Sequence, residues 1–134
     1  MATIRSEIMT LRSTMDIVNM RQSTRRWAIE AGFSLVDQTK IVTAASEIGR
    51  NTVVYGGGGT AHLELLNDQD RRGLRITFED KGPGIPDIEL ALKDGYGTGT
   101  GLGLGLGGAR RLVNEFAIQS RVGEGTRIAL TRWK

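Results

Sequence analysis

Two polar residues four positions apart, Glu47 and Asn51, form the first candidate site for chemistry in this 134-residue chain. In a helix, residues four apart project from the same side, and here both lie beside an apolar stripe. The amide oxygen of Asn51 could hold Mg²⁺ together with phosphate oxygens, because Mg²⁺ takes oxygen ligands and keeps several waters. The carboxylate of Glu47 would then be free to act as a base. A solvated polar pair on an amphipathic helix explains the same spacing.

The segment EDKGPGIPD, Glu79–Asp87, places an aspartate at the end of a predicted strand, before two glycines and two prolines. Asp80 could accept a hydrogen bond from an exocyclic amine. Gly82 and Gly84 would let a planar ring lie against the backbone, and the prolines would stiffen the turn. An ordinary turn that begins with aspartate fits the segment equally well.

The glycine-rich segment Gly99–Gly108 leads into a predicted helix. Unpaired N–H groups and the positive end of a helix dipole would favour an anion there. Gly103, Gly105 and Gly108 satisfy G-x-G-x-x-G, but residues 94–98 do not read as a strand and no Walker-type lysine follows. Neither a dinucleotide fold nor a P-loop is therefore indicated. A phosphate cradle with a mobile lid and a plain flexible loop remain as interpretations.

Hydrophobic periodicity predicts the elements that would position these motifs. The expected strands are 4–13, 61–67, 74–79, 116–122 and 126–133, and the expected helices are 15–31, 34 or 37 to 55, a short 87–93, and 104 or 106 to 115. Residues 68–73 would form a polar hairpin loop, and Tyr55 would end the buried stripe of the second helix. The order predicts a single α+β domain over residues 1–134, a two-layer sandwich with helices on one face of a mixed sheet.

Composition argues against several classes of protein. The chain has no cysteine and one histidine, His62, so disulfides, thiolate metal sites and histidine-based zinc sites are not expected. The net charge of +3 is mild and only 5% of residues are aromatic, so we expect no nucleic-acid partner. No signal pattern and no run of about 20 apolar residues occurs, so we expect no membrane association and a cytoplasmic location.

Together, and in this order, the motifs resemble those of the GHKL ATPase superfamily, which includes gyrase, Hsp90, histidine-kinase and MutL-type ATP sites. The matching segments are Glu47…Asn51 (N box), Asp80-x-Gly82-x-Gly84 (G1 box), Gly101-x-Gly103 (G2 box) and Gly123–Thr126 (the final glycine–threonine motif). The resemblance covers nearly the whole chain. It implies the Bergerat fold and an ATP site that uses Mg²⁺.

The same resemblance implies roles for individual residues. Glu47 would be the catalytic base, and Asn51 would hold Mg²⁺. Asp80 would accept a hydrogen bond from the adenine amine, and Thr126 would complete the adenine contacts. The nucleotide-binding residues that it implies are Asn51, Asp80, Gly82, Gly84, Thr98, Thr100, Gly101, Leu102, Gly103, Leu104, Gly105 and Thr126. Among these, Thr98 and Thr100 would close over the γ-phosphate, and the glycines of the G2 segment would bind phosphate through backbone N–H groups.

Within the superfamily, the chain is most similar to the small anti-sigma-factor serine kinases. Many of them carry a basic residue in the lid before the G2 glycines, whereas residues 95–100 here contain glycine, threonine and Tyr96 only. This composition favours the branch of stressosome switch kinases. The resemblance implies phosphorylation of a serine or threonine on a STAS-domain protein, with a PP2C-type phosphatase or a sigma factor as further partners.

Other interpretations remain open. The chain could be an ATP-dependent binding switch without catalysis, or a detached histidine-kinase catalytic domain that acts in trans. Four arginines are weaker candidates: Arg110 or Arg111 could add positive charge near the phosphates, and Arg21 and Arg26 could bind a partner. Solvated helix faces explain these arginines at least as well.

Overall fold

The computed structural model describes residues 1–93 and 105–134. Along the chain, the elements in these residues are β1 (Ala2–Leu11), α1 (Thr14–Glu30), α2 (Leu35–Val54), β2 (Gly59–Asp68), β3 (Arg71–Asp80), α3 (Ile88–Ala91), α4 (Gly105–Arg111), β4 (Glu115–Arg121) and β5 (Gly125–Trp133). The predicted order of strands and helices is confirmed. None of the helices in this part of the chain combines the length and hydrophobicity needed to cross a bilayer.

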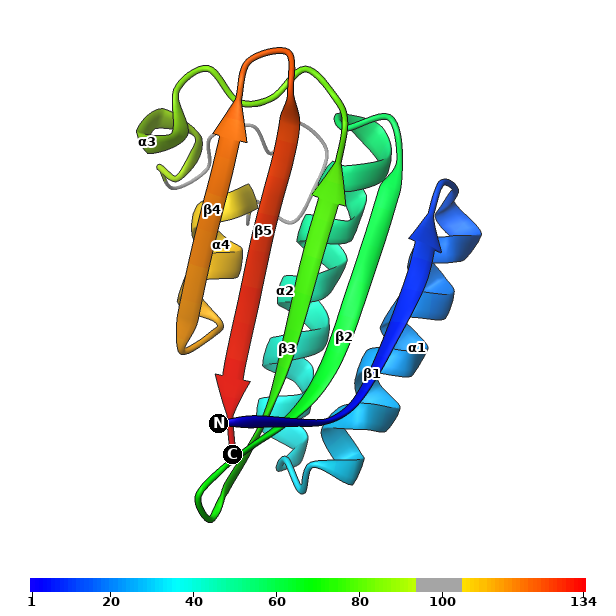
Figure 1. Ribbon diagram of the computed structural model, residues 1–134, viewed down its shortest axis with the longest axis vertical. Coiled ribbons are helices and arrows are strands. Elements are labelled where there is room, and N and C mark those ends of the chain that lie inside the picture. Colours follow the sequence, from blue (N-terminus) through cyan, green and yellow to red (C-terminus); the bar gives the residue numbers. More distant parts are fainter. Residues whose placement is uncertain (94–104) are drawn as a thin grey trace.

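The strands form one five-stranded sheet in the order β1-β2-β3-β5-β4, and every neighbouring pair is antiparallel. The expected mixed sheet is therefore wrong in this detail. Two helices join β1 to β2 and return the chain to the end where β1 finished, so β2 runs back beside β1 (Figure 1). Strands β3 and β4 do run in the same direction, but β5 lies between them and opposes both.

The helices α1, α2 and α4 cover one face of the sheet, as the two-layer prediction requires (Figure 1). The core fills the space between these layers. Its largest side chains, each at most 2% exposed, are Leu11, Met20, Trp27, Ile41, Ile48, Leu63, Leu74, Ile76, Phe78 and Leu130. Burial of one such side chain contributes about 1.5–3 kcal/mol relative to its exposure in water. This layer of apolar contacts fixes α2, which carries part of the site, against β3 and β5.

A second buried tryptophan, Trp133, lies on the opposite face of the sheet. Neighbouring strand residues point to opposite faces, and the preceding Arg132 reaches α2 on the helix side. Trp133 is 7% exposed, its indole N–H donates to Glu115 Oε2 at 2.6 Å, and the Arg71 guanidinium carbon lies 4.0 Å from its ring centroid. Gly73 pairs with Trp133, and a Cβ at Gly73 would collide with the ring. The open face therefore has its own small packed cluster.

The hairpin between β2 and β3 is tighter than predicted. Asp68 pairs with Arg71, so the turn contains Gln69 and Asp70 alone, and residues 68–73 are not a loop. Gln69 has a φ of +58°, as tight two-residue hairpin turns require. The polar residues that suggested a longer loop stand at an exposed strand end, where charged side chains are compatible with pairing.

Tyr55 is 61% exposed and does not belong to the buried stripe of α2. It is the C-terminal cap of that helix, beyond the turns that press on the sheet. The predicted stripe is otherwise confirmed, and its buried members are Ile41, Ala44, Ala45, Ile48 and Thr52.

Helix α4 ends at Arg111, four residues before the predicted limit at residue 115. The chain leaves the helix because Asn114 bonds to β5. The Asn114 backbone N–H donates to the Thr131 carbonyl oxygen at 2.9 Å, and its side-chain oxygen accepts from the Trp133 N–H at 2.7 Å. Tertiary pairing with β5 thus overrides the helical pattern of the sequence.

Two partly buried ion pairs hold these elements together. Arg132 on β5 donates to Asp37 Oδ1 in the first turn of α2 at 2.6 Å, and this hydrogen bond is the main reason why the pKa of Asp37 lies below its ordinary value of 3.8. Arg75 on β3 donates to both carboxylate oxygens of Glu64 on β2, and it lowers the pKa of Glu64 below 4.5. Both carboxylates are therefore stabilised in their charged form.

Candidate functional site

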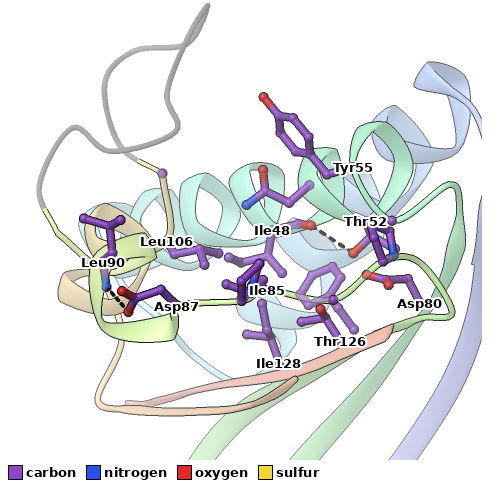
Figure 2. Close-up of a pocket in the computed structure, with 17 residues that line it drawn as sticks. Ile48, Thr52, Tyr55, Asp80, Ile85, Asp87, Leu90, Leu106, Thr126 and Ile128 are labelled. Carbon is purple, nitrogen blue, oxygen red and sulfur yellow. Dashed lines mark hydrogen bonds between the residues drawn. The ribbon is translucent and has the colours of Figure 1, made fainter. Parts of the chain in front are cut away.

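A cavity of about 520 Å³ lies between the C-terminal half of α2, the ends of β3 and β5, the segment that follows β3, and the start of α4. This volume is in the range of small-molecule sites. Its apolar side chains include Ile48, Phe78, Ile85, Leu90, Leu106 and Ile128, and its polar ones are Asn51, Thr52, Tyr55, Asp80, Asp87 and Thr126. Figure 2 shows Asp80 and Thr126 together at one end of the cavity, and Asp87 and Leu90 at the other.

Helix α2 lines the cavity with Ile48, Asn51, Thr52 and Tyr55. The spacing of three, four and seven residues places these positions on one side of a helix. Glu47 is half-buried and does not line the cavity. Since it stands four residues before Asn51, it lies one turn from Asn51 at the edge of this side.

Asp80, at the end of β3, has a carboxylate that is held in place by its own turn. Its Oδ1 accepts a hydrogen bond from the Gly82 N–H at 2.9 Å. A Cβ at Gly56 would collide with the Asp80 carboxyl group, and a Cβ at Gly82 would collide with the Gly56 backbone. Gly82 does not line the cavity. Contact between two chain segments is enough to explain its missing side chain, and the planar ring expected against it stays a prediction.

Gly84 lines the cavity and is required by backbone geometry. It has a φ of +78°, and a Cβ there would collide with the carbonyl oxygen of Arg121 at the end of β4. The neighbouring Pro83 carbonyl accepts from the Gly123 N–H at 2.8 Å. The turn after β3 is thus fastened to the β4–β5 hairpin.

Thr126 stands opposite Asp80 in the β3–β5 register, and the two side chains line the same cavity. Its hydroxyl lies 2.8 Å from the hydroxyl of Ser120 on β4. Ser120 also accepts from the Ile85 N–H at 2.8 Å. We did not predict Ser120 as a functional residue. Its pairing with Thr126, between the predicted strands 116–122 and 126–133, was a signal that could have indicated it.

The apolar cavity residues were also missed as functional residues. Ile48, Phe78 and Ile128 follow the same periodicity as ordinary core side chains, and only the fold shows that they border a cavity. Together with Ile85 and Leu106, they give the cavity apolar walls beside the polar pair Asp80 and Thr126. Such walls suit a flat apolar ring with polar edges.

The structure brings five of the predicted nucleotide-binding residues together around the cavity: Asn51, Asp80, Gly84, Gly105 and Thr126. Gly82 does not line the cavity, but its N–H donates a hydrogen bond to the Asp80 carboxylate. The remaining predicted positions, Thr98, Thr100, Gly101, Leu102, Gly103 and Leu104, lie outside the described residues. The four candidate arginines, Arg21, Arg26, Arg110 and Arg111, are exposed, and the cavity lining does not include them.

The cavity is compatible with Mg²⁺ bound mainly by a ligand's own oxygens. Within residues 1–93 and 105–134, no group of three or more His, Cys, Asp or Glu side chains could hold a metal ion. Asn51 supplies one amide at the cavity wall. Because Mg²⁺ keeps several waters and is commonly held by few protein ligands and substrate phosphates, this donor set fits a Mg²⁺–phosphate complex.

Comparison with known proteins identifies the family. Residues 36–133 match the family described as "Histidine kinase-, DNA gyrase B-, and HSP90-like ATPase". The chain belongs to this ATPase family. The matched span contains all of α2 except Leu35, and it contains every residue that lines the cavity, so the family assignment and the cavity coincide. The resemblance to GHKL ATPases is therefore confirmed.

A curated member of this family narrows the class of enzyme. The chain is 48% identical over 118 residues to the serine/threonine-protein kinase RsbT of Bacillus subtilis (strain 168), and the alignment covers 88% of this chain and 89% of RsbT. This relative confirms the expected similarity to small serine kinases and the expectation of an ATP-dependent serine/threonine kinase.

Solved structures confirm the α+β fold of the family. The RsbU and RsbW domains of Rv1364c from Mycobacterium tuberculosis superpose with a TM-score of 0.66 at 24% identity, over 97% of this chain and 33% of that chain. The chain thus spans about a third of that solved chain. The mycobacterial sensor histidine kinase MprB gives a TM-score of 0.55 at 16% identity, over 96% and 97% of the two chains. The SiaB–SiaC complex from Pseudomonas aeruginosa gives 0.55 at 12%, over 98% and 91%. At these identities, the structures show the fold alone.

Proposed function

We propose that this ATPase-family kinase, a single domain over residues 1–134, transfers the γ-phosphate of Mg-ATP to a serine or threonine of a STAS-domain protein. The observation that carries the proposal is the convergence of Asn51, Asp80 and Thr126 on one cavity in a chain that is 48% identical to RsbT. The reaction belongs to a partner-switching pathway in the cytoplasm. A PP2C-type phosphatase or a sigma factor would be the further partner.

The adenine ring would occupy the end of the cavity beside Asp80 and Thr126. An ionised carboxylate only accepts hydrogen bonds, so Asp80 is suited to the exocyclic amine of adenine. The hydrogen bond from the Gly82 N–H orients this carboxylate before the nucleotide binds. The apolar walls would enclose the faces of the ring and exclude water from them.

The phosphates would extend from the adenine toward Asn51 and Gly105. The side-chain oxygen of Asn51 would hold Mg²⁺, and backbone N–H groups at and before Gly105 would bind phosphate oxygens. When bound, Mg²⁺ neutralises charge on the phosphates, which is the main requirement in phosphoryl transfer. Asn51 therefore connects the nucleotide to α2, the helix that also carries Glu47.

Glu47 would be the general base. It would accept the hydroxyl proton of the substrate serine while the serine oxygen bonds to the γ-phosphorus and ADP leaves. A positioned base contributes about 10²–10⁴-fold in rate. Its place one turn from Asn51, outside the cavity lining, is consistent with a group that meets a protein substrate at the rim and does not contact the adenine.

The test is transfer of phosphate from Mg-ATP to a co-encoded STAS-domain protein, measured by intact mass. Glu47→Gln keeps the size of the side chain and removes the base, so we expect at least about a hundredfold slower transfer with unchanged ATP binding. Glu7→Gln on β1 is the matched control and should transfer phosphate at the wild-type rate. The phosphate should be stable in acid, as a phosphoserine is.

Three results would contradict the proposal. Normal transfer by Glu47→Gln would remove Glu47 as the base. An acid-labile phosphate would indicate histidine phosphorylation in trans. Binding of ATP and of the STAS-domain protein without any transfer would identify a nucleotide-dependent binding switch.

A further inference from the structure

The hydroxyl group of Ser120 connects three segments around the adenine end of the cavity. The Ile85 N–H, in the turn after β3, donates to Ser120 Oγ at 2.8 Å. Ser120 Oγ donates to the Gly125 carbonyl oxygen at 3.1 Å. It also lies 2.8 Å from Thr126 Oγ1, and in this contact either hydroxyl could be the donor.

The chemistry of a hydroxyl group decides the direction of that last bond. A serine hydroxyl has one proton and two lone pairs. The Ile85 N–H occupies one lone pair, and the Gly125 carbonyl, which can only accept, takes the proton. The second lone pair is then filled only if Thr126 donates. In this arrangement all three hydrogen-bonding positions of Ser120 are satisfied, and Thr126 has no proton left for the cavity.

The consequence is that the cavity presents two acceptors at its adenine end. Asp80 and Thr126 are register partners and point to the same face of the sheet. The Asp80 carboxylate can only accept, and Thr126, with its proton directed to Ser120, offers lone pairs. A pair of acceptors matches an amino group and opposes a carbonyl oxygen. Adenine carries an amino group at its six position, where guanine carries a carbonyl oxygen.

We propose that Ser120 is a specificity-determining residue that selects adenine over guanine nucleotides by fixing Thr126 as a hydrogen-bond acceptor. The inference rests on the proposed ATP site. Ser120 does not line the cavity, so it acts through Thr126 and is a positioning residue. Removing its hydroxyl leaves Thr126 free to turn its proton toward a guanine oxygen.

The experiment measures dissociation constants for Mg-ATP and Mg-GTP with the wild type, Ser120→Ala, Thr126→Val and the double variant. We expect the wild type to prefer ATP, and Ser120→Ala to reduce the GTP-to-ATP ratio of dissociation constants about tenfold, the size of one hydrogen bond. In the Thr126→Val background, where no hydroxyl remains to reorient, Ser120→Ala should leave the ratio unchanged. Ser23→Ala on α1 is the control, because it also deletes a hydroxyl that accepts a hydrogen bond, from Arg26 at 2.9 Å.

The ratio of the GTP and ATP dissociation constants distinguishes a role of Ser120 in nucleotide specificity from a role that only stabilises the turn after β3. If Ser120→Ala weakens ATP and GTP equally, or changes the ratio equally in both backgrounds, Ser120 is only structural and the inference is wrong. Equal wild-type affinity for the two nucleotides would overturn this inference alone, whereas a wild type that binds neither would overturn the proposed function as well.

A second comparison covers the case in which Ser120→Ala does not fold, as measured by its unfolding midpoint. Thr126→Ser keeps the hydroxyl and should keep the full ATP preference, whereas Thr126→Val, in which Asp80 is the one acceptor left of the pair, should have a smaller preference. If these two variants have the same preference, the inference is overturned.

Discussion

Asp80 on β3 and Thr126 on β5 oppose one another in the antiparallel register, and both side chains enter the same cavity. Their strands are interior members of the sheet, with β2 on one side and β4 on the other. Each therefore has hydrogen-bonded neighbours on both edges. The two groups that would contact the nucleotide base therefore stand on strands that are hydrogen-bonded on both sides, which limits their freedom before binding.

Replacing Asp80 with asparagine should weaken ATP binding at least about tenfold. The variant keeps the shape of the side chain but removes the charge, and hydrogen bonds to charged groups contribute about 1.5–3 kcal/mol. Titration calorimetry with Mg-ATP measures the change. Glu79→Gln, one residue earlier and on the opposite face of β3, is the control and should bind as the wild type does. Equal affinities for Asp80→Asn and the wild type would rule out an adenine contact by Asp80.

Gly84→Ala should destabilise the fold more than Gly123→Ala does. Both glycines have positive φ, +78° and +82°, which costs an alanine about 1–2 kcal/mol at each position. At Gly84 the added Cβ also meets the Arg121 carbonyl oxygen, whereas at Gly123 it meets open space. We expect a loss of about 3 kcal/mol or more for Gly84→Ala in urea unfolding. Equal losses would show that the close approach to β4 does not matter.

Asn51→Ala should remove the dependence of ATP binding on Mg²⁺. The wild type should bind ATP more tightly with Mg²⁺ than with a chelator, because the metal joins the phosphates to the amide. In the variant, the affinity with Mg²⁺ should fall toward the value measured with chelator. Asn19→Ala, at an exposed position of α1, serves as the control. A full Mg²⁺ effect in Asn51→Ala would mean that the ion is bound without this side chain.

Stability should fall in acid, partly through Asp37. Its pKa is below 3.8 in the folded chain because Arg132 donates to it, so the folded state binds the proton less readily than the unfolded state. The stabilisation is thus complete above the unfolded pKa and is lost as the pH falls through the lower folded pKa. We expect urea unfolding from about pH 5 to pH 2 to show a shallower decline for Asp37→Asn than for the wild type. An identical decline would exclude a contribution from the Arg132 pair. Asp70→Asn, in the hairpin turn, should behave as the wild type does.

The sequence predicted the elements well, because their signals are local. Alternation in β3 and the apolar stripe of α2 arise from burial of one face, and both are confirmed. The sheet was harder to predict, because its pairing depends on where distant strands insert. Strand β5 lies between β3 and β4, and nothing within either segment shows that position. Tyr55 continues the helical period of α2 but stands past the last turn that the sheet covers.

The candidate site likewise contains residues that local motifs predict and residues whose role depends on contacts between distant segments. Asn51, Asp80 and Thr126 could be predicted because each stands in a recognisable motif. Ser120 could not, since its bond to the Ile85 N–H joins residues 35 positions apart and exists only after the β4–β5 hairpin folds over the turn. The sequence also could not show why residue 82 is a glycine, because the cause is the close approach of the Gly56 backbone in the folded chain. The roles proposed for Glu47 and for the residues from Thr98 to Leu104 remain predictions.

The two tryptophans of the chain lie on opposite faces of the same sheet, Trp27 in the helix-covered core and Trp133 in the open-face cluster. Neither lines the cavity. Variants that keep one tryptophan each would therefore act as separate optical probes of the two faces. If their emission changes at the same denaturant concentration, the sheet and both its coverings unfold as one cooperative unit. Separate transitions would mean that the open-face cluster can melt while the nucleotide site stays folded.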